Sequence, residues 1–153
     1  IAAVKYADLS MTRDSNYKFS FDKMLSLNGN TAPYMLYVYA RISGIIAKTI
    51  PNQKSILAFD YIHLASESEI LLAKQIIRFS DVLGDVEKNL YPSKLCDYLY
   101  ELSHKFNQFY EKCPVVTAES KELQESRAAL CRATAETLKV GLEILGIETL
   151  HKL

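Results

Sequence analysis

Apolar residues recur at intervals of three and four positions over long stretches of this chain, which is the spacing of amphipathic helices. One such seam lies in residues 93–112 and consists of Leu95, Leu99, Leu102, Phe106 and Phe109. A second long helix is predicted over residues 121–145, and Gly146 follows it where a left-handed residue commonly ends a helix. Both patterns predict helices that bury one face in a core.

Capping residues and prolines predict where the remaining helices begin and end. Ser66 and Glu69 have the spacing of a capping box, so a helix should run from there to about residue 79. Ser80 should cap a shorter helix, and Ser93 should cap the helix after Pro92. Residues 1–9 and 22–27 and the second half of 53–64 are also predicted as helical, and residues 17–21 as extended. The sequence therefore predicts an all-α helical bundle of about five to seven helices.

A helix predicted over residues 32–48 separates its side chains by chemistry. Thr31 is its expected N-cap after an Asn28-Gly29-Asn30 turn. At about 100° per residue, a single arc of about 80° holds an aromatic and basic set, made of Tyr34, Tyr37, Arg41, Gly44 and Lys48. The opposite side carries Met35, Tyr39, Ile42 and Ile46. A third side should pack closely against another helix through Leu36, Ala40 and Ala47.

Periodicity leaves two interpretations of the aromatic and basic arc open. Tyr34 and Tyr37 could be boundary residues whose hydroxyls reach solvent, with Arg41 extended beside them. Alternatively, the tyrosine rings stack on unpaired nucleic-acid bases while Arg41 supplies charge and hydrogen bonds. Such stacking does not require a high net charge.

Composition narrows the functional classes. The 153 residues suffice for one domain with its own core, and five glycines and four prolines are too few for a many-stranded sheet protein. The formal charge of zero disfavours broad binding to a phosphate backbone. No apolar run has the roughly 18 residues of a membrane span, so no membrane partner is expected. The wide spacing of Cys96, Cys113 and Cys131 favours reduced thiols of a cytoplasmic protein over disulfides or a metal site.

Four blocks of sequence stand in an order typical of one family. The first is residues 4–9, and the second is residues 21–25 and 29–34 with Tyr37 and Arg41. The third is residues 95–103 with Phe106 and Tyr110, and the fourth is residues 127–131, 133–135, 141–142 and 145–147. Together they resemble the C-terminal anticodon-binding domain, of the DALR type, of arginyl-tRNA synthetases. The resemblance is closer to enzymes of the eukaryotic cytosolic type than to common bacterial ones.

This resemblance implies a function and a set of site residues. The family's all-α domain holds the tRNA anticodon stem-loop, so the implied partner is tRNA-Arg. Carried over by position, the implied anticodon contacts are Asn30, Tyr34, Tyr37, Arg41, Tyr110 and the chain end Leu153, where many family members have methionine. Residues 1–20 correspond to the segment that leaves the family's catalytic domain, and residues 21–153 to the anticodon-binding domain. The parent enzyme would be a monomer that attaches arginine to tRNA in the cytoplasm with ATP.

No catalytic residue is expected in this chain. Lys23-Met24-Leu25-Ser26 departs from the Lys-Met-Ser-Lys signature of class I synthetases, and no phosphate-binding loop is present. Glu67 and Glu69 are interpreted as solvated acids at a helix start, and His104 as a structural histidine. The chain alone should therefore bind neither cofactor nor metal, and its preceding catalytic domain is expected to be missing. The alternatives are a helical module that binds proteins through tyrosine anchors and, without a supporting motif, a free-standing enzyme.

Overall fold

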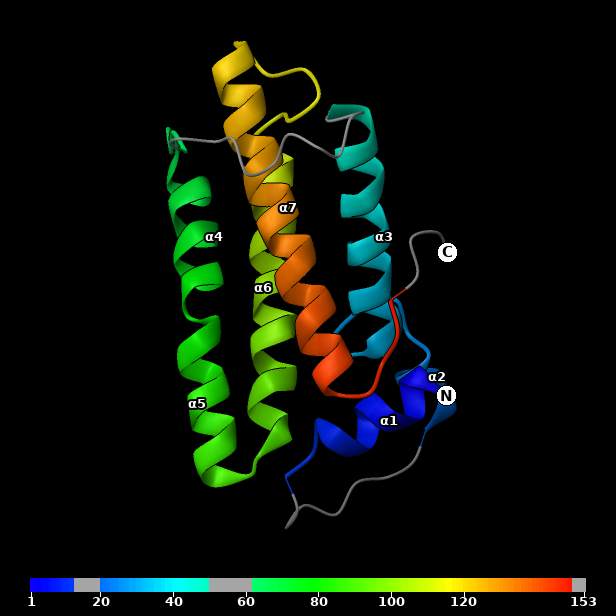
Figure 1. Ribbon diagram of the computed structural model, residues 1–153. Coiled ribbons are helices and arrows are strands. Elements are labelled where there is room, and N and C mark those ends of the chain that lie inside the picture. The colour runs from blue at the N-terminus through cyan, green and yellow to red at the C-terminus, as the bar shows by residue number, and fades with distance from the viewer. Residues whose placement is uncertain (13–19, 50–61, 150–153) are drawn as a thin grey trace.

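The computed structural model describes residues 1–12, 20–49 and 62–149 (Figure 1). These residues form seven α-helices and no strand, which confirms the predicted all-α class. The helices are α1 (Ala2–Leu9), α2 (Phe21–Met24), α3 (Ala32–Thr49), α4 (Glu67–Ile77), α5 (Phe79–Asn89), α6 (Pro92–Lys112) and α7 (Lys121–Ile144).

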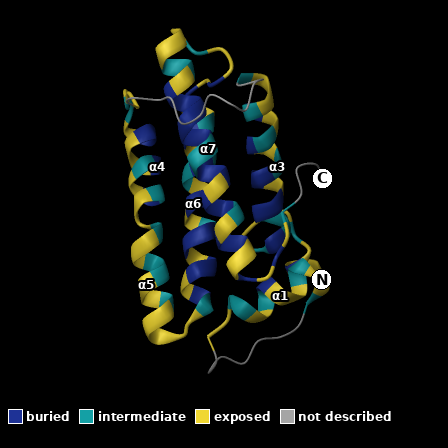
Figure 2. Cartoon of the chain, in the orientation of Figure 1, coloured by how far each residue is buried: buried dark blue, intermediate teal, exposed yellow. Residues whose placement is uncertain are grey.

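Five helices form the body of the bundle, and α1 and α2 lie at one end of it (Figure 1). Helices α4 and α5 follow one another along one side, α3 forms the other side, and α6 and α7 run between them. Buried residues of α3, α6 and α7 make up most of the core of the bundle (Figure 2). Tyr6 of α1 is buried in the same core, so α1 shares the core of the bundle.

The predicted apolar seams are confirmed. All five residues of the α6 seam have no exposed surface. On α7, Leu130, Leu138 and Leu142 are buried, and Gly146 has the left-handed φ of +71° that ends the helix region. The long helices are therefore specified by patterns that are local in sequence.

Helix ends follow the predicted caps only in part. The Ser66–Glu69 capping box is present, and the Thr31 hydroxyl accepts a hydrogen bond from the Tyr34 backbone at 3.3 Å. The prediction that Ser80 and Ser93 act as caps is wrong. Helix α5 begins directly after Arg78, which ends α4 in a nearly helical conformation. Pro92 begins α6, since its fixed φ suits the first turn of a helix, and Ser93 is buried inside that turn.

Three further local predictions are incorrect within the described residues. Phe21, predicted as extended, begins α2, and residues 62–64 are not helical. On α3, Ala47 is exposed and does not pack closely, because the buried face of this helix continues through Ile42 and Ile45. The other parts of the predicted segments 17–21 and 53–64 lie outside the described residues.

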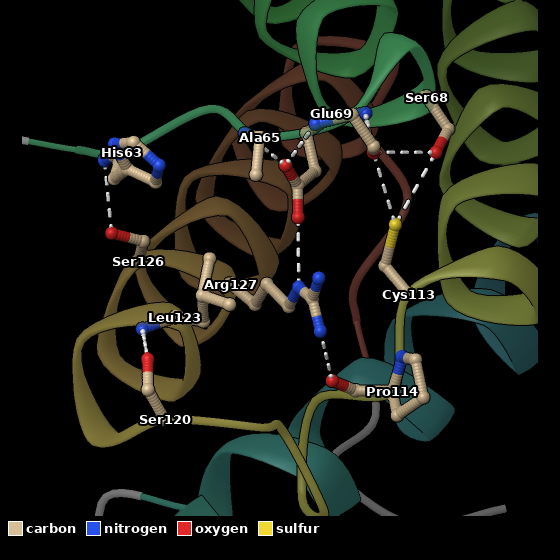
Figure 3. A network of polar contacts seen from close by, with 11 residues as sticks. His63, Ala65, Ser68, Glu69, Cys113, Pro114, Ser120, Leu123, Ser126 and Arg127 are labelled. Carbon is tan, nitrogen blue, oxygen red and sulfur yellow. Dashed lines mark hydrogen bonds and ion pairs between the residues drawn. The ribbon is translucent and has the colours of Figure 1, made fainter.

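A buried ion pair joins Glu69 of α4 to Arg127 of α7 (Figure 3). The Arg127 Nε donates to Glu69 Oε1 at 2.7 Å, and the two side chains are 8% and 0% exposed. Arg127 Nη1 also donates to the carbonyl of Pro114, just after α6, at 2.8 Å. The second Glu69 oxygen accepts from the backbone N–H groups of Ala65 and Ser66 at 2.6 and 2.8 Å. One polar cluster thus ties together α4, α7 and the end of α6.

Burial of Glu69 corrects its interpretation as a solvated acid. Desolvation acts to raise the pKa of Glu69, but the hydrogen bonds from Arg127 and the backbone outweigh it, so this pKa lies below its ordinary value. The pair is therefore charged at neutral pH. The Cys113 thiol lies next to the pair, 3.2 Å from the Ser66 hydroxyl and 3.3 Å from the Ser68 hydroxyl (Figure 3). These contacts extend the polar cluster beside the ion pair.

Replacing Glu69 by glutamine should destabilise the protein at neutral pH by about 3–5 kcal/mol, because Arg127 would remain buried without an anion. The pKa of Glu69 is lowered by folding, so its stabilising effect is present at neutral pH and is lost as pH falls through that pKa. Urea unfolding followed by circular dichroism should therefore show a difference from the wild type that shrinks in acid. Exposed Glu67→Gln, the matched control, should change the stability by less than about 0.5 kcal/mol. A difference independent of pH would contradict the charged pair.

Alanine substitutions at two helical glycines should change the stability of the protein in opposite directions. A Cβ on Gly141 of α7 would lie 2.5 Å from Leu99 Cδ2, whose side chain is fully buried in α6. Gly141→Ala should therefore lower the free energy of unfolding by about 1–3 kcal/mol. A Cβ on Gly84 of α5 would meet nothing within 4 Å, so Gly84→Ala should raise the free energy of unfolding by about 0.5–1 kcal/mol through helix propensity. Effects of the same sign in thermal unfolding would contradict close packing of α6 on α7.

Candidate nucleic-acid interface

The exposed side of α3 carries the predicted aromatic and basic residues. The helix starts after the Thr31 cap, and its core-facing residues fix which side meets solvent. Tyr37 is 43% exposed, Arg41 is exposed, and Tyr34 is half-buried. The sequence could predict which residues of α3 face solvent, because the spacing within a single helix determines it.

Helix α6 supplies the second half of the site. The Arg41 guanidinium carbon lies 5.0 Å from the centre of the Tyr110 ring of α6 and 5.9 Å from that of Tyr37. Both distances are in the range of cation–π attraction. The Tyr34 ring lies 5.8 Å from the ring of Tyr100, also on α6. The structure thus brings together four of the predicted site residues, Tyr34, Tyr37, Arg41 and Tyr110, across two helices.

Tyr110 is anchored to the core through Phe106. The two rings are nearly parallel, with an interplanar angle of 17° and centres 6.1 Å apart, and Phe106 has no exposed surface. A ring held in this way is a rigid support, since it loses little side-chain freedom when a flat ligand stacks on it. The arrangement can bind planar groups and anions, but it contains no nucleophile paired with a base.

Asn107 of α6 joins the two helices and is a residue that sequence reasoning missed. Its Nδ2 donates to the Tyr34 hydroxyl at 2.9 Å, and its Oδ1 accepts from Arg41 Nη1 at 3.3 Å. Burial raises the pKa of Tyr34, and the Asn107 hydrogen bond partly opposes this shift. Asn107 lies seven positions after Tyr100, so the two residues share one face of α6. This spacing alone could not identify Asn107, because only the packing of α6 on α3 distinguishes it from other polar residues of the helix.

The remaining predicted contacts lie elsewhere. Asn30 precedes α3 and has internal partners: its Oδ1 accepts from the Tyr6 hydroxyl at 2.6 Å, and its Nδ2 donates to Asp97 Oδ1 at 3.1 Å. Burial raises the pKa of Asp97, and the Asn30 hydrogen bond partly opposes this shift. Leu153 lies outside the described residues. His104, interpreted as a structural histidine, is exposed on α6 with its ring 6.5 Å from that of Tyr100.

In residues 1–12, 20–49 and 62–149, no cluster of three or more His, Cys, Asp or Glu side chains could hold a metal ion. Over the same ranges, no helix has both the length and the apolar character that a membrane crossing requires. All three cysteines are described, and each is buried and free of disulfides. The α3–α6 face is therefore the arrangement with the most evident ligand chemistry.

Comparisons with known proteins agree on a family. A family model described as the DALR anticodon binding domain matches residues 35–153. Arginine–tRNA ligases of Nostoc punctiforme and Rippkaea orientalis are each 54% identical to this chain over 153 residues, covering all of the chain and 26% of the relative. The chain thus spans about a quarter of the length of these relatives. Since both are cyanobacterial proteins, the predicted eukaryotic cytosolic type is not supported.

Solved structures show the same fold. An arginyl-tRNA synthetase from Plasmodium falciparum is similar over 99% of this chain and 26% of its own, with a TM-score of 0.87 and 38% identity. One from Thermus thermophilus has a TM-score of 0.85 and 25% identity over the same shares of the two chains. With its family model covering residues 35–153 and its helices superposing on these enzymes, the chain belongs to the DALR anticodon-binding domain family.

Proposed function

We propose that this chain is the anticodon-binding domain of an arginine–tRNA ligase and binds the anticodon stem-loop of tRNA-Arg. The observation that carries the proposal is the α3–α6 face, on which the Arg41 guanidinium lies between the rings of Tyr37 and Tyr110. Aromatic rings stack on unpaired bases, and a guanidinium adds charge and hydrogen-bond donors. Anticodon loops present unpaired bases of this kind.

The zero net charge of the chain fits a loop better than a long duplex. Binding along a duplex depends on many phosphate contacts and so on a broad basic surface. Stacking contributes about 1–3 kcal/mol per base and does not depend on the charge of the whole domain. We therefore propose that the RNA bases mainly contact Tyr34, Tyr37 and Tyr110. Asn30 and Leu153 are further proposed contacts.

The proposal extends to the protein from which the domain comes. Its larger part would activate arginine with ATP and attach it to tRNA in the cytoplasm, as a single copy. Residues 1–20 would be the segment that leaves this catalytic domain, and residues 21–153 the anticodon-binding domain. Burial of Tyr6 in the core of the bundle would hold α1 of that segment firmly against the domain.

Replacing the exposed aromatic and basic residues should weaken RNA binding. Tyr37→Ala removes a stacking ring, and Arg41→Ala removes the cation beside it, so each should reduce affinity by about 5- to 100-fold. Fluorescence anisotropy with a labelled anticodon stem-loop of an arginine tRNA measures this at several salt concentrations. Wild-type affinity in both variants would show that the face is wrong. Stem-loop binding that is both weak and independent of salt and sequence would favour a protein-interaction module.

A negative charge placed on the same face should also weaken binding. Gly44 lies one turn after Arg41 on α3, and a Cβ there would meet no atom within 4 Å, so Gly44→Glu should fold normally. Its carboxylate should lower stem-loop affinity by about 3- to 10-fold, the effect of roughly 1 kcal/mol of repulsion near a protein surface. Gly84→Glu on α5, at the opposite side of the bundle, has equally open surroundings and should leave affinity unchanged (Figure 1). Equal effects of the two changes would mean that only net charge matters.

A further inference from the structure

Asn107 lies at the junction of the two helices that form the proposed RNA face. It is half-buried, and its amide contacts Tyr34 on one side and Arg41 on the other. The two bonds span 73 and 66 positions of sequence, so they depend on how α3 packs against α6. The side chain has a position that is fixed by both helices.

The chemistry of its neighbours determines which way the amide is turned. A guanidinium has donors and no acceptor, so the Asn107 oxygen must face Arg41. The amide nitrogen then faces Tyr34 and donates to its hydroxyl oxygen, as the 2.9 Å contact shows. A hydroxyl that accepts this bond still has its own hydrogen to donate.

The Tyr34 hydrogen has no acceptor among the residues that the structure describes. Burial raises the pKa of Tyr34, so the hydroxyl keeps its proton at neutral pH. Arg41 likewise uses Nη1 for Asn107 and has further N–H groups on its guanidinium, which lies beside the Tyr37 and Tyr110 rings. The groups that this site offers to a ligand are therefore hydrogen-bond donors.

We propose that Asn107 is a positioning residue that turns Tyr34 and Arg41 into a fixed array of donors for an oxygen acceptor of the bound RNA. The acceptor is either a base carbonyl oxygen or a phosphate oxygen, which share this chemistry. Asn107 does not contact the RNA itself in this arrangement; it acts through its two neighbours. The inference rests on the proposed RNA function and adds the kind of RNA group that the site selects. A buried donor left without an acceptor weakens binding, so the array should favour RNA groups that offer an oxygen acceptor.

Without Asn107, both neighbours lose their common partner. The Tyr34 hydroxyl can then rotate, and Arg41 can leave the Tyr110 ring for solvent, so RNA binding has to order both groups again. Asn107→Ala should therefore reduce affinity for the arginine-tRNA anticodon stem-loop by about 3- to 10-fold, as expected for one or two lost hydrogen bonds. Exposed Gln108→Ala, on the next position of α6, is the matched control and should leave affinity unchanged.

A double-mutant cycle separates positioning from direct contact. In a chain that carries both Tyr34→Phe and Arg41→Ala, the further change Asn107→Ala should reduce affinity by less than about twofold, because the residues through which it acts are gone. If its effect is as large there as in the wild type, Asn107 contacts RNA directly and the proposal is wrong. An unchanged affinity of Asn107→Ala beside a weakened Arg41→Ala would also overturn it. If Arg41→Ala itself has no effect, it is the proposed function that fails.

An isosteric change at Asn107 separates positioning from a purely structural role, because it should lower RNA affinity without lowering stability. Asn107→Asp keeps an acceptor for Arg41 but has no donor for Tyr34, whose hydrogen would then be used inside the protein. Its thermal stability should stay at the wild-type value or rise, whereas its stem-loop affinity should fall several-fold below that of Gln108→Asp, which adds the same charge one position away. Equal affinities of the two aspartate variants would contradict the proposal.

The source of the acceptor can be found with the same assay. The loss caused by Tyr34→Phe is measured on stem-loops in which each loop base is replaced in turn. A base carbonyl predicts that the loss disappears for one replacement only, and a phosphate predicts an equal loss on every loop. Either result identifies the acceptor and supports the array, whereas no loss on any loop would overturn the donor role of Tyr34.

Discussion

The buried ion pair between Glu69 and Arg127 is the constraint on which the arrangement of the bundle depends. A charge without water is costly unless every group around it is bonded, so the geometry of the pair admits few alternatives. It fixes the start of α4 against α7, and through Arg127 it also holds the carbonyl of Pro114. That carbonyl follows α6 directly, and Asn107 and Tyr110 lie in the last two turns of α6. The internal pair therefore positions one half of the proposed RNA face without being part of it.

The other half of the face depends on apolar packing. Helix α3 packs on α7 and α6, and Met35 and Ile42 on its inner side have no exposed surface. With this side fixed in the core, the side that carries Tyr37 and Arg41 has to face outward. The two halves then meet through the Asn107 amide and the contact of Arg41 with Tyr110. Polar and apolar constraints from different parts of the bundle thus converge on one small surface.

Periodicity predicted the features that a single helix determines. The α6 seam and the outward side of α3 follow from side-chain spacing, so they could be located before any tertiary information. The pairing of Glu69 with Arg127 and of Arg41 with Asn107 could not, because the partners are 58 and 66 positions apart. Glu69 shows the difference within one residue. Its capping box is local and predictable, whereas its burial is decided by α7, which comes much later in the chain.

The resemblance to the family added residues that no helical pattern could supply, and their structural surroundings differ. Tyr110 joins the face of α3 through its contact with Arg41, which brings two of the proposed contacts together. Asn30, in contrast, uses both ends of its amide for Tyr6 and Asp97, and so links α1 to α6 at the start of α3. Its proposed contact with RNA would have to use the second hydrogen of Nδ2 or the oxygen that already accepts a bond from Tyr6. Asn30 therefore has an evident role in holding α3, and through α3 it can influence Tyr34 and Arg41 whether or not it reaches the RNA.

A neutral domain that binds RNA must obtain its affinity from a few well-ordered groups. Counterion release follows the number of phosphates contacted, and a face that carries Arg41 and Lys48 would contact few of them, so the dependence on salt should be shallow but measurable. Stacking on rings and hydrogen bonds from fixed donors have to supply the remainder, and both lose much of their value if the side chains must first be ordered. In the proposed arrangement, Phe106 behind Tyr110 and Asn107 between Tyr34 and Arg41 would remove that cost before the ligand arrives. The order built into the junction of α3 and α6 would thus let a small face with few charged groups bind a polyanion.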